Sequence, residues 1–153
     1  MLRRCGDDYF SNSRAFPVFA KIGSLDNRVR SLIAVLYAVY HREGEANSII
    51  DKFNFGKSYY ISLKGDGGEF NEEDYKRRDK RFKTIIASDF DQLPFRLRQL
   101  IKFIKSKDGL IDFIDLLRDL YNWESDDKWV QRKWVKGFYN IRNSQKEGEY
   151  NEQ

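Results

Sequence analysis

The chain has 153 residues, of which 34% are charged and 16% aromatic, and its formal net charge is +4. A chain of this length buries about two thirds of its unfolded surface in one core, which favours a single domain and excludes disorder of the whole chain. A single cysteine and a single histidine exclude an internal disulfide framework and a Cys/His zinc site.

The N-terminal residues argue against a secretory signal, because Arg3, Arg4, Asp7 and Asp8 stand where its apolar segment would lie. The longest apolar run, residues 32–40, is far shorter than the roughly 20 residues that a membrane-spanning helix needs. We therefore expect a cytoplasmic protein without a membrane partner.

Residues 1–24 contain Pro17 and mixed polarity, so they are predicted to form an N-terminal arm with one helical turn at residues 16–21. A first long helix is predicted to begin at Asp26 or Asn27, either of which can cap it, and to end at His41. Because both of its sides are apolar, this helix is predicted to be central. A short helix is expected at residues 46–53.

The segment KGDGGEFN, residues 64–71, is the strongest run of helix-breaking residues and predicts a mobile surface loop. Asn71 can then cap a helix from Glu72 to about Ala87. Its narrow apolar stripe is surrounded by cations. These are Lys76, Arg77, Arg78, Lys80, Arg81 and Lys83.

The next predicted helix is capped by Asp91, carries Pro94 in its first turn and ends at Gly109. Apolar residues recur along it from Leu97 at helical spacing. The opposite stripe carries Arg98, Lys102 and Lys105. Asp112 is the predicted cap of the following helix, which is expected to end near residue 123.

The last helix is predicted to begin at residues 125–127, and the polar residues 143–153 are predicted to form a flexible tail. Its apolar side carries Val130, Trp134 and Phe138, and its other side carries Lys128, Arg132 and Lys136. At this spacing Trp134 is expected in the core, as is Trp123, whereas Trp129 lies off the stripe and is freer to stack on a base.

These elements predict an all-α fold: a single compact bundle of about six helices over residues 25–142, with no strand pattern of useful length. The charge is unevenly distributed. Residues 76–105 carry ten Lys and Arg against three Asp, residues 112–127 have a net charge of −5, and residues 128–142 have a net charge of +5. Such blocks often form solvated faces whose charges pair with one another. The first block favours an anionic partner.

The sequence contains few residues that could form a catalytic site. The single histidine, His41, follows an apolar helix without a nucleophile beside it, and is better explained as a helix-end residue. Asp112, Asp115 and Asp119 share one helix and could hold Mg²⁺, although the first two fit a cap and a first-turn acid better. The GDGGE loop lacks the Gly-Lys-Ser/Thr ending of a phosphate loop. We predict no catalytic residue, no metal site and no cofactor.

Three segments resemble CasB, the small-subunit family of the type I-E CRISPR surveillance complex Cascade. They are LRR at residues 2–4, RRDKRFKTIIASDFDQLPFRLRQLI at 77–101 and IDFIDLLRDLYNWESDDKWVQRKWVKGFY at 111–139. These segments are similar to the family in the order of their arginine, leucine-proline and tryptophan positions. The similarity covers about half of the chain. The family usually has a further helix before LRR, so this chain is expected to begin differently.

The resemblance implies an all-α, non-catalytic subunit that works as a pair in antiviral defence. It also implies contacts with other Cascade subunits, with guide RNA and with the target and displaced DNA strands. Cations of the family carry over to Arg4, to Arg28 or Arg30, and to Arg81 and Arg98. Helix-face geometry alone adds further candidates for phosphate contact. These are Arg77, Arg78, Lys102, Lys105, Arg132 and Lys136.

Two alternatives stay open. A helical adaptor that binds only protein would use the acidic segment 112–127 against a basic surface of another subunit. A metal-dependent nuclease would be built on the three aspartates of that segment. The same acidic segment, set between two basic ones, also predicts that two copies associate head to tail on a nucleic acid.

Overall fold

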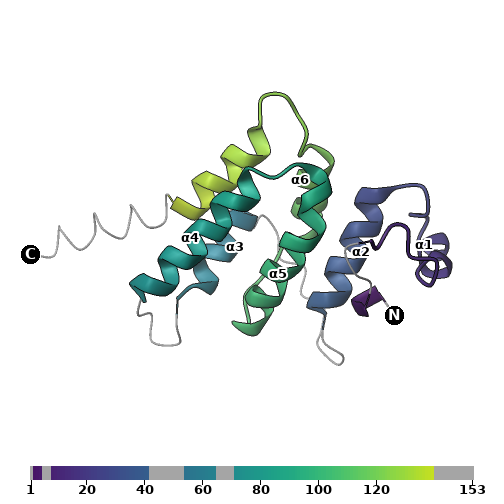
Figure 1. The fold of residues 1–153 in the computed structure, drawn as a ribbon, viewed down its shortest axis with the longest axis horizontal. Coiled ribbons are helices and arrows are strands. Elements are labelled where there is room, and N and C mark those ends of the chain that lie inside the picture. Colours follow the sequence, from purple (N-terminus) through teal and green to yellow (C-terminus); the bar gives the residue numbers. More distant parts are fainter. Residues whose placement is uncertain (1, 5–7, 42–53, 65–70, 140–153) are drawn as a thin grey trace, which may run out of the picture.

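The structure is a computed structural model that describes residues 2–4, 8–41, 54–64 and 71–139, and every regular element among these residues is helical. The elements are η1 (Leu2–Arg4), α1 (Phe16–Lys21), α2 (Arg28–Tyr40), α3 (Phe55–Ser62), α4 (Glu72–Ile86), η2 (Phe90–Gln92), α5 (Leu93–Ser106) and α6 (Phe113–Tyr121). Residues 129–139 form a last helix (Figure 1). The predicted all-α class is confirmed. None of the helices described here has the length and apolar character needed to cross a membrane.

Helix α5 lies in the middle of the molecule. It packs against α2 on one side and against α3 and α4 on the other (Figure 1). Helix α2 was predicted to be central because both of its sides are apolar, and it packs against three elements, α5, α6 and η1, although α5 rather than α2 lies in the middle of the molecule (Figure 1). Its mixed apolar surface is explained by these three neighbours, one of which comes from the extreme N-terminus.

The start of α2 was predicted correctly. The side chain of Asn27 accepts a hydrogen bond from the Arg30 backbone amide at 3.0 Å, which satisfies one of the amides that a helix leaves open at its start. The arm before it joins the same core. Its buried apolar side chains are Tyr9, Ala15 and Phe19.

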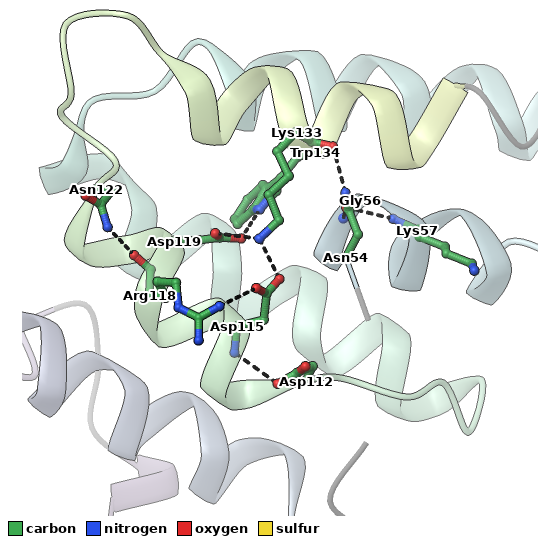
Figure 2. Close-up of polar contacts among 10 residues, drawn as sticks. All are labelled: Asn54, Gly56, Lys57, Asp112, Asp115, Arg118, Asp119, Asn122, Lys133 and Trp134. Atoms are coloured by element: carbon green, nitrogen blue, oxygen red, sulfur yellow. Dashed lines mark hydrogen bonds and ion pairs between the residues drawn. The ribbon is translucent and has the colours of Figure 1, made fainter. Parts of the chain in front are cut away.

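Helix α3 was missed, while the helix expected at 46–53 lies outside the described residues. Asn54 caps α3 by accepting from the amides of Gly56 and Lys57 at 2.8 and 3.3 Å. Its own amide group donates to the Lys133 carbonyl at 2.7 Å, which ties α3 to the last helix (Figure 2). Gly56 permits this approach, because a Cβ there would stand 2.0 Å from the Trp134 carbonyl oxygen.

The cap of α4 is Asn71, as predicted; most of the predicted loop, residues 65–70, lies outside the described residues. Asp91 does not cap α5. It lies in η2 and forms an ion pair with Arg28, and α5 begins at Leu93 with Pro94 in its first turn. Helix α5 ends at Ser106, before the predicted Gly109, and Asp108 takes the left-handed conformation, with φ 51°.

The core is rich in aromatic rings, and Trp123, Trp134 and Phe138 are fully buried in it, as predicted. The Trp123 indole donates to the Ser88 carbonyl at 2.9 Å, and the Phe138 ring stacks on Phe82 with centroids 4.4 Å apart. The Trp123 contact joins the segment after α6 to the turn that follows α4, and the Phe138 contact joins the last helix to α4. Trp129 is partly buried against the same core. The predicted tail, residues 143–153, lies outside the described residues.

Candidate nucleic-acid interface

The three aspartates that could have held a metal belong to the framework of α6 (Figure 2). Asp112 caps α6 by accepting from the Asp115 amide at 2.9 Å. The Lys133 ammonium donates to Asp115 at 2.6 Å and to the buried Asp119 at 2.8 Å. The Trp134 indole donates to the other oxygen of Asp119 at 2.7 Å. The described residues contain no group of three His, Cys, Asp or Glu side chains that could hold a metal.

Burial raises the pKa of Asp119, and the hydrogen bonds from Lys133 and Trp134 act in the opposite direction. Burial likewise disfavours the charged form of Lys133, but its hydrogen bonds to Asp115 and Asp119 raise its pKa overall. Each oxygen of this buried carboxylate thus accepts a hydrogen bond, one from an ammonium and the other from an indole. This cluster therefore joins α6 to the last helix and leaves little capacity for another ligand.

Two of the three predicted cations of α5 hold the C-terminal end of α2. Lys105 donates to the Val39 carbonyl at 2.8 Å and to the His41 carbonyl at 3.4 Å. Arg98 donates to the Arg3 carbonyl at 2.7 Å, and Arg3 itself donates to carbonyls at the end of α2. We call this region, made of Arg3, Arg98, Lys105 and the end of α2, the α2–α5 seam.

The seam has a clear electrostatic reason. The end of a helix leaves carbonyl groups open and carries partial negative charge, so cations stabilise it. Helix α2 has no basic residue in its last turn, and the cations come from η1 and α5 instead. Arg98 and Lys105 are accordingly half-buried, whereas Lys102, predicted on the same stripe, is exposed. The expectation of one exposed stripe holds for Lys102 alone.

The candidates at the start of α2 also contact the protein. Arg28 forms ion pairs with Asp91 at 3.0 Å and Glu124 at 3.2 Å, and its guanidinium lies 4.1 Å from the centre of the Phe90 ring. Arg30 donates to the Tyr121 hydroxyl at 3.1 Å. Both arginines remain exposed, so they can reach a phosphate, but Arg28 is already neutralised. Arg4 is the last residue of η1, and its side chain lies outside the described part of the structure.

A basic groove of about 470 Å³ lies between α4 and α5. We call it the α4–α5 groove. Arginine and lysine side chains of α4 line one side, the α5 side contributes an arginine, an aromatic ring and an amide, and no carboxylate lines it. Its lining residues are Arg77, Arg78, Lys80, Arg81, Thr84, Ile85, Phe95, Arg96, Gln99 and Leu100.

The groove cations differ in how they are held. Arg78 is half-buried, pairs with Asp74 at 3.5 Å and lies 3.8 Å from the centre of the Phe103 ring. Arg96 donates to the Thr84 carbonyl at 3.1 Å and to the Ser88 hydroxyl. The other three, Arg77, Lys80 and Arg81, are exposed, and within the described residues they form no ion pair or side-chain hydrogen bond.

The last helix adds a third basic face, as its periodicity predicted. Lys128, Arg132 and Lys136 are exposed, and Arg132 has an acidic neighbour, Asp127, at 3.8 Å. Lys133 is withdrawn from this face by the Asp115 and Asp119 carboxylates.

Sequence reasoning singled out Arg77, Arg78 and Arg81 and missed Phe95, Arg96 and Gln99, which the structure brings opposite them. Helical spacing shows which residues of α5 share a face, but not which helix that face meets. A sequence signal was nevertheless present, because Phe95 lies off the apolar stripe that begins at Leu97 and so was not needed for the core.

The family profile described as CRISPR-associated protein Cse2 matches residues 1–139. The chain belongs to the CRISPR-associated Cse2 family. The Cse2 relative from Thermus thermophilus is 39% identical over 69 residues, which are 45% of this chain and 39% of that protein. The match thus spans about two fifths of the relative's length.

A solved structure extends the Cse2-family assignment over nearly the whole fold. The crystal structure of M. ruber CasB has a TM-score of 0.66 against this chain and is 27% identical to it. The alignment covers 95% of this chain and 85% of the M. ruber protein. The resemblance first carried by three sequence segments is thereby confirmed at the level of the family.

Proposed function

We propose that this Cse2-family chain is a non-catalytic subunit of a type I-E Cascade complex that binds nucleic-acid backbone and helps to hold opened target DNA in antiviral defence. The observation that carries the proposal is the α4–α5 groove. Arg77, Lys80 and Arg81 present positive charge without a carboxylate in the lining. Family membership supplies the CRISPR context.

The physical basis is the electrostatics of the phosphate backbone. Cations that neutralise phosphates release condensed counterions, and this term is independent of base sequence. When a guide RNA displaces one DNA strand, the base-pairing energy is nearly exchanged, so backbone contacts can decide whether the opened state persists. Arg77, Lys80 and Arg81 of α4, which form no ion pair within the described part of the chain, supply such contacts.

The remaining candidates fall into two groups under this proposal. Lys102, Arg132 and Lys136 are exposed and extend the basic surface beyond the groove. The others contribute less to binding, since they already contact the protein. These are Arg28, Arg30, Arg78, Arg98 and Lys105, while the side chain of Arg4 lies outside the described part of the structure.

We also propose the partners implied by this function: guide RNA, the target and displaced strands, other Cascade subunits and a second copy of the chain, in the cytoplasm. Complementary charge supports the pairing. Asp126 and Asp127 are exposed between α6 and the last helix, while the groove and the last helix expose cations. Head-to-tail contact would set one copy's acidic surface against a basic surface of the next.

An adaptor role has one specific observation in its favour. Ile114 and Tyr121 of α6, seven residues apart and hence on one face, are 59% and 47% exposed, and Leu110 before the helix is 47% exposed. These exposed apolar side chains lie on either side of the exposed Arg118, and an apolar surface of this kind suits a protein partner. Such docking at α6 would leave the α4–α5 groove available for nucleic acid, because none of these three apolar residues lines it.

The test is a charge-removing double variant in the groove, Arg77→Ala with Arg81→Ala. The slope of log affinity against log salt is negative, and two lost phosphate contacts should make it shallower by about 1.4 for single-stranded DNA, at about 0.7 per contact. Fluorescence anisotropy over a salt series measures that slope. The matched control is Arg14→Ala with Lys21→Ala, which removes the same charge from exposed positions of the N-terminal arm. Equal slopes for both variants would contradict groove binding, and Mg²⁺-dependent cleavage by the purified chain would favour the nuclease alternative.

A further inference from the structure

Phe95 is a large apolar side chain whose exposure the fold does not explain. It is 53% exposed, although it lies in the first turn of α5, where its neighbours Leu93, Pro94 and Leu97 are buried. Single exposed apolar residues are common on proteins and need no explanation. Phe95 is different because it lines the α4–α5 groove together with cations.

The ring shares its face of α5 with polar side chains. Gln99 is one turn further along and also lines the groove, and Lys102 is two turns along and exposed. Two turns correspond to about 11 Å along the helix axis. An aromatic ring, an amide and an ammonium group therefore follow one another along a single exposed stripe.

Opposite this stripe, α4 presents Arg77 and Arg81, which are one turn apart, and the buried side chains of Ile85 and Leu100 form the apolar part of the lining. The groove thus combines cations with an apolar, aromatic interior. A phosphate alone would not use the apolar part, and an apolar peptide would not use the cations. An unpaired nucleotide carries both a charged phosphate and a flat apolar base.

We propose that Phe95 is a stacking platform for an unpaired base. The α4–α5 groove would then bind a single strand that carries bases more tightly than a duplex or a strand without bases. This inference rests on the proposed function, because the same groove cations would hold the flanking phosphates. Gln99 lies where its amide can hydrogen-bond the edge of the stacked base. In duplex DNA the bases are enclosed, and the ring would have no partner.

The experiment compares two single-stranded probes of equal length and equal phosphate number, an oligothymidylate and a fully abasic oligonucleotide. The full chain should bind the oligothymidylate at least about fivefold more tightly, since stacking of one base on an aromatic ring contributes roughly 1 to 3 kcal/mol. Phe95→Leu keeps the apolar volume without the aromatic face and should abolish this preference. Phe95→Trp should retain it. Because the ring is exposed, the melting temperature should not change.

Two outcomes separate this inference from the proposed function. If Arg77→Ala with Arg81→Ala weakens both probes equally while the base preference remains, both proposals stand. If Phe95→Leu keeps the full preference for the oligothymidylate, stacking on Phe95 is wrong although phosphate binding by the groove survives. Should Phe95→Leu leave both affinities unchanged but release another subunit from the assembled complex, the ring is a protein contact and the stacking proposal is overturned.

Discussion

Cations serve different purposes on the two sides of α5. Toward α2, Arg98 and Lys105 donate to backbone carbonyls at 2.7 and 2.8 Å and are half-buried. Toward α4, the groove holds Arg77 and Arg81, which are exposed and have no carboxylate in the lining around them. A basic helix face is therefore not by itself a binding surface. What decides its role is whether the facing element offers open acceptors.

The largest effect should come from a residue outside both regions, and it sets the scale for the others. Trp134→Ala should cost roughly 3 to 5 kcal/mol of unfolding free energy, because the indole is fully buried and donates to Asp119. Urea denaturation measures this loss. Under conditions in which nearly all of the variant is folded, its groove should keep its affinity for single-stranded DNA. An unchanged unfolding midpoint would show that the indole is not part of the core.

The seam is tested by a matched pair on α5, Lys105→Met and Lys102→Met. Lys105→Met leaves the carbonyls of Val39 and His41 without this donor and should cost about 1 to 3 kcal/mol. Lys102 is exposed, and its loss should stay within about 0.5 kcal/mol. Urea unfolding of both variants measures the difference. Equal unfolding midpoints would contradict the claim that Lys105 of the seam stabilises the fold more than the exposed Lys102 does.

Arg96 has features of both regions, so it is the position at which the comparison could fail. It lines the groove, yet it donates to the Thr84 carbonyl and to Gln92 like a seam residue. Arg96→Lys keeps the charge but loses the forked hydrogen bonding, and should cost about 1 kcal/mol while the salt slope of binding stays unchanged. Denaturation and salt titration of the same variant check both halves. A lower slope with unchanged stability would make Arg96 a phosphate ligand.

Most of the helices follow from local patterns in the sequence. Asn27, Asn71 and Asp112 cap their helices as predicted, because a cap depends on a side chain and on amides two or three residues away. Asp91 misled for the same reason. It has the residue type of a cap, but it lies inside the 3-10 turn η2, and its carboxylate pairs with Arg28, 63 residues earlier in the chain.

The candidate site was only partly predictable. The α4 side of the groove was identified from its cations, whereas Phe95 and Arg96 enter it through the packing of α5 on α4, which periodicity does not encode. Helix α3 was missed because it is short and nearly all buried, so it shows no amphipathic contrast. Helix α3 is placed by the contact of Gly56 with Trp134, and a contact between residues so far apart in sequence leaves no local pattern to predict from.

The way in which α2 ends has a consequence for the order of events during synthesis. Its last carbonyls are held by Lys105, which follows them by 66 and 64 residues, and Arg98 reaches Arg3 across 95 residues. When α2 leaves the ribosome, these partners have not yet been made. Because closing such long loops is slow, the N-terminal segment docks late, after α5 has been translated. Until then the carbonyls at the end of α2 lack their donors, and the segment that is translated first is the last to complete its contacts.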